Sequence, residues 1–184
     1  SRSWHHNIDH PLNHKNLGAE KPFQLVIFQG GSGETNTVSE RKTFSKTVKN
    51  IVNKIHNSGA EAALYMIHAY VEPHENTNPQ MIKDIKKMYI DAGNENNALV
   101  IPVGIAFENS YSENPDIKLH KHYDGSHPNL LGTYLAACVV FASITQISPK
   151  KVEYSYFNKI NNEDKAYLQK IAHETVENFY DINL

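Results

Sequence analysis

The chain has 184 residues, which fits one domain of ordinary size, and 40% of them are hydrophobic, enough for a packed core. The net charge is −2 and the two arginines are Arg2 and Arg41, so no basic stripe points to nucleic acid as a partner. The longest apolar run, near residues 135–144, is too short and too often interrupted by small polar residues to span a membrane. No apolar signal segment stands at the start, and the compartment, cytoplasmic or secreted, is left open.

The first segment, residues 1–22, is polar and has no clear apolar period. Such a pattern predicts an irregular segment or loop. Its histidines are His5, His6, His10 and His14. Their spacing fits no standard metal site, so we expect a solvated loop.

The rest of the chain alternates between strand-like and helix-like patterns. Three short apolar runs are typical of buried strands: residues 24–28, 62–67 and 98–103. Four segments have apolar residues at helical spacing: residues 39–57, 81–90, 129–144 and about 163–180. Ser58-Gly59 and Asp91-Ala92-Gly93 are expected to end the first two helices. Cys138, the single cysteine, lies in the third helix and is expected to be a buried small hydrophobic residue.

Buried strands that alternate with amphipathic helices predict an α/β fold with a parallel sheet. In such sheets the functional residues lie in loops at the carboxyl ends of the strands. Three segments qualify as such loops: residues 29–36, 68–79 and 104–127. The motifs described next fall in the first and the third, which favours a single site.

The first loop is rich in glycine and reads Gly30-Gly31-Ser32-Gly33-Glu34-Thr35-Asn36. A phosphate-binding P-loop needs a lysine where Glu34 stands, and a dinucleotide-binding turn needs a glycine where Asn36 stands. A nucleophile elbow also fails, because its last glycine is replaced by Glu34. Two interpretations are left: a turn whose backbone N–H groups face an anion, and a tight turn with no further role.

The third loop ends in a cluster of polar residues that can be interpreted in two ways. Its potential metal ligands are His120, His122, Asp124 and His127. The order of the first three resembles the start of the metallo-β-lactamase motif. There a histidine directly follows the aspartate, whereas Gly125 and Ser126 intervene here.

The other interpretation is an acid–base pair formed by Asp124 and His127. A catalytic histidine needs a carboxylate that fixes its tautomer and stabilises its protonated form. A three-residue offset in a turn that enters a helix can bring the two side chains together. Pro128 would fix this turn by occupying the first helical position, and Asn129 or Ser126 would cap the helix.

The residues around this pair resemble a known family. Residues 124–137, DGSHPNLLGTYLAA, closely resemble the last motif of the SGNH (GDSL-type) hydrolase superfamily, in which Asp and His complete a Ser-His-Asp triad. Residues 25–32 are similar to its third strand and residues 98–110 to its last strand. The closing helix, with residues 167–172, also fits. The resemblance covers nearly the whole chain from about residue 23.

The resemblance implies a flavodoxin-like, three-layer α/β/α fold and hydrolysis of an ester, with an acetyl or other short acyl group on a carbohydrate as candidate substrate. His127 would be the general base and Asp124 its orienting partner. No metal or organic cofactor would be needed. In place of the family's oxyanion motif the chain has Gln29-Gly30-Gly31-Ser32, so one of these groups is expected to bind the oxyanion.

The family's nucleophilic serine follows its first strand, and only about 23 residues precede the first strand seen here. We therefore expect residues 1–184 to be the C-terminal portion of a larger domain, with the nucleophile on an upstream segment or a second chain. The alternative is Ser32 as nucleophile. Two other classes of function stay open: a metal-dependent hydrolase, and a non-catalytic binding domain on a hydrolase scaffold.

Overall fold

The structure, a computed structural model, describes residues 23–184, so the four histidines of the first segment lie outside the described residues. It forms two compact units, the first of residues 23–66 and 87–100, the second of residues 67–86 and 101–184. The helices and strands are, in chain order, β1 (Leu25–Phe28), η2 (Ser32–Thr35), α1 (Val38–Asn57), β2 (Glu61–Tyr65), α2 (Met81–Asn96), β3 (Leu99–Ile101), α3 (Val103–Glu113), α4 (Leu130–Thr145), η3 (Pro149–Lys151) and α5 (Asn162–Tyr180).

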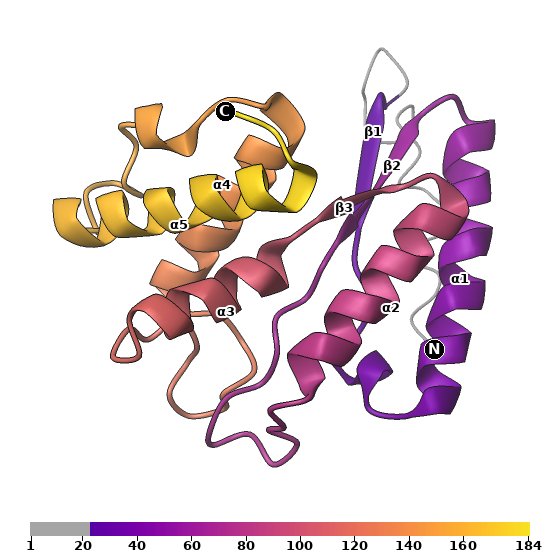
Figure 1. Cartoon of the computed structure of the whole chain (residues 1–184), viewed down its shortest axis with the longest axis horizontal. Helices are drawn as coiled ribbons and strands as arrows, with labels where there is room; N and C mark the ends of the chain where they lie inside the picture. Colours follow the sequence, from indigo (N-terminus) through magenta and orange to yellow (C-terminus); the bar gives the residue numbers. More distant parts are fainter. Residues whose placement is uncertain (1–22) are drawn as a thin grey trace. The chain divides into compact units, whose positions relative to one another are not determined.

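The sheet lies in the first unit and has β2 between β1 and β3 (Figure 1). β1 and β2 pair in parallel, with Leu25 opposite Glu61 and Phe28 opposite Leu64. The side chain of Thr37 accepts the N–H of Glu40 and so caps α1. The buried face of α1 carries Phe44, Val48, Val52 and Ile55, at helical spacing. The predicted α/β class with a parallel sheet is confirmed.

Helix α2 runs to Asn96, past the glycine that was expected to end it. A Cβ on Gly93 would lie 2.9 Å from the carbonyl oxygen of Ala98 and would overlap a methyl group of Val100. Gly93 therefore lets the helix approach the start of β3 closely. The prediction was wrong because a glycine that serves close packing has the same sequence pattern as a glycine that ends a helix.

The third loop was also predicted wrongly, because residues 103–113 form helix α3. β3 ends at Ile101, and Pro102 follows it as the residue that precedes the helix. The buried residues of α3 are Val103, Gly104, Ala106, Phe107 and Ser110, at helical spacing. Residues 98–110 were likened to the family's last strand, and the helical spacing from residue 103 onward was therefore missed.

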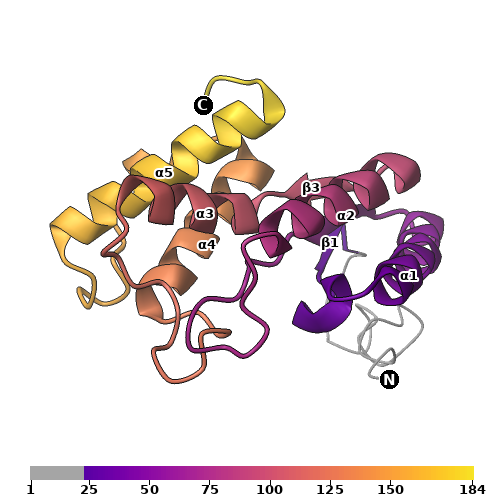
Figure 2. The ribbon, with the colours of Figure 1, turned by 60° about the horizontal axis from the view of Figure 1, so that its bottom comes forward.

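The second unit contains α3, α4 and α5, which lie together in both views (Figures 1 and 2). Asn129 caps α4 by accepting the N–H of Gly132, which confirms one of the two predicted caps. Pro128 therefore does not occupy the first helical position, and it pairs instead with His120 in an antiparallel bridge. Cys138 is buried, as predicted.

Within residues 23–184, no helix is long and apolar enough to cross a membrane.

The close packing at Gly93 predicts the effect of adding one methyl group. Gly-to-Ala substitutions inside helices normally stabilise, but here the Cβ would overlap Val100, so we expect Gly93→Ala to lower the free energy of unfolding by about 1–2 kcal/mol. Thermal and urea unfolding would measure the change. Asn94→Ala, on the exposed side of the same helix, should leave stability unchanged or slightly raised. Equal stabilisation by both substitutions would contradict the packing argument.

Candidate active site

A turn in the second unit places the carboxylate of Asp124 against the imidazole of His127. Asp124 Oδ2 lies 2.9 Å from His127 Nδ1. An ionised carboxylate has no proton to donate, so Nδ1 carries the proton and donates it. In the neutral ring, Nε2 then has a free lone pair. The His127 side chain is 71% exposed, so this nitrogen atom is available to a substrate or nucleophile.

The same carboxylate also closes the turn. Asp124 Oδ1 accepts the backbone N–H groups of Ser126, at 2.8 Å, and of His127, at 3.0 Å. These bonds, with the N–H of His127 as the larger contribution, lower the pKa of Asp124 to about 2. Asp124 is therefore ionised throughout the neutral range, as a partner that orients a histidine must be.

Gly125 allows the turn to sit close to the loop that follows β2. Its φ of +60° lies in the left-handed region, and a Cβ there would overlap the carbonyl oxygen of Val71. The N–H of Val71 donates to the carbonyl of Gly125 at 2.9 Å. The base of the turn is closed by a bond from Lys121 N–H to the His127 carbonyl, at 2.8 Å. The backbone thus holds the Asp–His pair in place from two sides.

The structure does not favour the metal-binding interpretation. His120 is buried, whereas His122 points to solvent. Within residues 23–184, no group of three or more His, Cys, Asp or Glu side chains is arranged to hold a metal ion. Of the four ligands in the metal hypothesis, the structure brings together only Asp124 and His127.

A second cluster, which sequence reasoning missed, lies behind the turn. His120 Nε2 is 3.0 Å from His68 Nδ1, and His120 Nδ1 is 2.6 Å from the Tyr111 hydroxyl. The ring of His68 stacks on Phe107 at 4.5 Å. His68 lies three residues after the end of β2, in the second of the predicted loops. Its place at the carboxyl end of a buried strand was the available signal, but nothing in the sequence shows its link to His120, 52 positions away.

Both histidines of this cluster are held in the neutral form. Burial is the main cause that lowers the pKa of His68 to about 4, and burial and His68 together lower the pKa of His120 to about 4. An unfolded histidine takes up its proton near pH 6.5. This pair therefore contributes stability at neutral pH that is lost as the pH falls from about 6.5 through about 4.

The glycine loop lies in the first unit. Ser32 is exposed at the start of η2, and Gln29 is exposed as well. The N–H of Gly30 donates to the Tyr89 hydroxyl, and the N–H of Gly31 donates to the Glu34 carboxylate, each at 3.1 Å. An anion bound by these two N–H groups would have to replace those partners. The oxyanion role of residues 29–31 stays a prediction.

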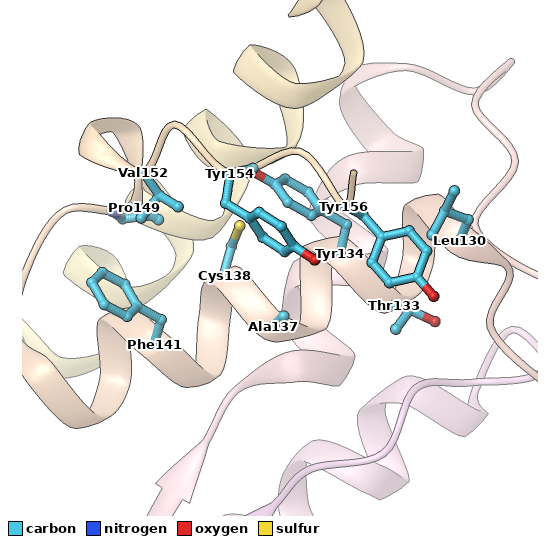
Figure 3. Close-up of a pocket in the computed structure, with 10 residues that line it drawn as sticks. All are labelled: Leu130, Thr133, Tyr134, Ala137, Cys138, Phe141, Pro149, Val152, Tyr154 and Tyr156. Atoms are coloured by element: carbon cyan, nitrogen blue, oxygen red, sulfur yellow. The ribbon is translucent and has the colours of Figure 1, made fainter. Parts of the chain in front are cut away.

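A pocket of about 390 Å³ runs along α4, between this helix and the segment around η3 (Figure 3). Its lining begins shortly after His127 in the sequence, at Leu130 and Thr133 in the first turn of α4. Its remaining lining residues are Tyr134, Ala137, Cys138, Phe141, Pro149, Val152, Tyr154 and Tyr156. Burial raises the pKa of the Cys138 thiol to about 11, so Cys138 is no nucleophile. The pocket offers apolar and aromatic surface to a ligand.

The hydrogen bonds at Asp124 predict how its pKa responds to substitution. In His127→Ala the ring is lost, but both backbone N–H donors stay, so the Asp124 pKa should remain clearly below the usual value. Carboxyl ¹³C NMR between pH 1.5 and 6 would measure it. His122→Ala, an exposed neighbour, is the matched control and should leave the titration unchanged. A normal Asp124 pKa in the His127 variant would show that the ring, and not the backbone, causes the shift.

No family model matches the sequence, and no curated protein matches it. Three solved structures resemble its fold. A DUF4886 family protein from Bacteroides uniformis is 22% identical, with a TM-score of 0.76 over 93% of this chain and 68% of that protein. A protein from Slackia heliotrinireducens, provisionally assigned to the SGNH hydrolases, is 19% identical, with a TM-score of 0.58 over 73% of this chain and 77% of that protein.

The third structure is an acetyl xylan esterase, 17% identical, with a TM-score of 0.53 over 71% of each chain. These likenesses concern the fold, since every identity is below 25%. They agree with the predicted alternation of strands and helices. The chain therefore has the SGNH-hydrolase-like α/β fold.

Proposed function

We propose that this chain carries the acid–base half of a serine esterase active site. The observation that supports it best is the 2.9 Å bond between Asp124 Oδ2 and His127 Nδ1, which leaves His127 Nε2 as an exposed base. The likeness to SGNH-type folds, one of them an acetyl xylan esterase, supports the same chemistry. The Asp124 carboxylate stabilises the imidazolium that forms when Nε2 takes a proton.

In the proposed mechanism His127 acts first as base and then as acid. A serine Oγ attacks the ester carbonyl carbon while its proton passes to His127 Nε2. The tetrahedral intermediate collapses, and the same proton goes to the leaving alcohol oxygen, which gives the acyl-enzyme. Water then attacks the acyl carbon, again with its proton taken by Nε2. Release of the acid returns this proton to the serine Oγ.

Two sources of the nucleophile are compatible with this proposal. One is a serine on a segment or chain other than residues 23–184. The other is Ser32, which is exposed and follows a strand and a glycine turn. A non-catalytic binding domain would have the same fold but no reactive serine, so labelling of the serine separates it from both.

The proposed substrate is an acetyl or other short acyl ester of a carbohydrate. The pocket along α4 supports this class, because sugar rings pack on aromatic side chains and its wall contains three tyrosines, Tyr134, Tyr154 and Tyr156. It begins at Leu130 and Thr133, close in sequence to His127. A ligand seated there would lie along the helix that the Asp–His turn precedes.

The first test of the proposal removes the base. We expect His127→Ala to lower kcat/KM on 4-nitrophenyl acetate by ~10³-fold or more, because the serine loses its proton acceptor. Asp124→Asn should lower it somewhat less. His122→Ala, five residues before His127 and exposed, is the control and should keep full activity. Undiminished hydrolysis by the His127 variant, folded as the wild type, would rule out the acid–base role.

The second test locates the nucleophile. A fluorophosphonate probe should label one serine of the active protein, and peptide mass spectrometry would identify it. Loss of labelling in Ser32→Ala, with Ser39→Ala as a control in the next helix, would assign the nucleophile to Ser32. Labelling that persists in Ser32→Ala would place the nucleophile elsewhere. No labelling of a protein that binds carbohydrate would favour the binding domain.

A further inference from the structure

The hydrogen bonds behind the Asp–His turn have a direction. The N–H of Leu119 donates to the Tyr111 oxygen at 3.2 Å, so the phenolic proton is left to be donated elsewhere. We assign this proton to the bond with His120 Nδ1, at 2.6 Å, and Nδ1 is then unprotonated. A neutral His120 then carries its proton on Nε2. That N–H donates to His68 Nδ1 at 3.0 Å.

The chain of donors fixes the tautomer of His68. Because its Nδ1 accepts from His120, the neutral His68 ring must carry its own proton on Nε2. The opposite direction, with His68 Nδ1 as donor, would leave the Tyr111 hydroxyl without an acceptor among residues 23–184. Within residues 23–184, the other hydrogen-bond contact of His68 Nδ1, to the Ala69 carbonyl, is 3.5 Å long and too weak to reverse the order.

The Nε2–H of His68 reaches the solvent. Among the described residues, the buried side-chain nitrogen and oxygen atoms without a partner are Thr35 Oγ1, His56 Nε2 and Ser143 Oγ. His68 Nε2 makes no hydrogen bond within residues 23–184 and is not one of these buried atoms. It is therefore a donor that keeps some contact with solvent, on a half-buried ring that contacts Phe107 and His120.

His68 is also tied to the turn that carries the base. The loop after His68 bonds to Gly125 through Val71, and His120 joins the turn through its bridge to Pro128. Burial is the main cause that lowers the pKa of His68, and the charge of His127 contributes in the same direction. A fixed neutral donor and a base therefore lie in one neighbourhood.

We propose that His68 is a second catalytic histidine of this site, whose Nε2–H donates to the ester carbonyl oxygen and stabilises the negative charge that this oxygen gains during attack. The inference rests on the esterase function proposed above. It gives Tyr111 and His120 a positioning role, because they hold the His68 proton on the nitrogen that faces solvent. A histidine that stays neutral keeps this donor over the whole neutral pH range.

The first test needs no catalysis. ¹⁵N NMR of the histidine rings in the full chain should show both His68 and His120 as neutral Nε2–H tautomers at pH 7. Tyr111→Phe should lower the share of the Nε2–H tautomer in His120 and, as a consequence, in His68. Tyr123→Phe, an exposed control, should leave both tautomers unchanged. A His68 ring that is Nδ1-protonated or charged at pH 7 in the wild type would overturn the inference.

The second test measures 4-nitrophenyl acetate hydrolysis. His68→Phe keeps a ring on Phe107 but removes the donor, so kcat should fall by ~10²–10³-fold with KM nearly unchanged. His68→Gln offers an amide N–H near the same place and should recover ~10-fold or more of that loss. The pH at which activity falls on the acid side should stay the same in both variants, because His127 keeps its bond to Asp124. His122→Phe should have wild-type activity.

The two proposals fail in different ways. Full activity of a folded His127→Ala variant would end the esterase assignment, whatever His68 does. An inactive His127 variant together with a fully active His68→Phe variant would overturn the inference on His68 alone. A shifted acid limb in His68→Phe would also overturn it, because the residue would then act through the Asp–His pair. If His68→Phe does not fold, the NMR tautomer and the His68→Gln kinetics decide.

Discussion

The candidate site depends on one close approach of backbone to backbone, between Gly125 and Val71. Only a residue without Cβ fits there, since a Cβ would overlap the Val71 carbonyl oxygen, and the positive φ of Gly125 also favours glycine. The approach lets the turn fold back so that both backbone N–H groups after Gly125 reach the carboxylate of Asp124. Because that carboxylate is fixed, the ring of His127 has one preferred orientation. The orientation of the His127 ring therefore depends on Gly125, two residues earlier, having no side chain.

The two halves of this region differ in charge, one because of backbone hydrogen bonds and the other because of burial. Backbone N–H groups stabilise a full negative charge on Asp124, with its pKa lowered to about 2. In the buried cluster, burial keeps His68 and His120 neutral, with pKa values of about 4. A charged histidine next to the cluster would be repelled if its members were protonated. In the proposed reaction, neutral neighbours would allow His127 to accept a proton without a competing positive charge.

Sequence patterns predicted the three strands, four of the helices and the Asp–His pair because these depend on local spacing. The strands, α1, α4 and α5 were found from apolar periodicity, and the pair from a three-residue offset within a turn. The errors came from non-local contacts. Gly93 serves packing against Val100 rather than helix termination, and Pro102 separates a short strand from α3. The cluster of His68 with His120 could not be predicted, since its members are 52 positions apart and neither lies in a motif.

The acid–base half of the proposed site is complete within the second unit. Every contact that orients Asp124 and His127 comes from residues 67–86 and 101–184, and the same holds for His68 and its partners. The base is therefore oriented before a nucleophile or substrate arrives, which is the condition under which polar groups lower a reaction barrier most. Neither source of the serine changes this. The oxyanion donor proposed on His68 belongs to the same unit as His127, so both groups are oriented before the serine engages the substrate.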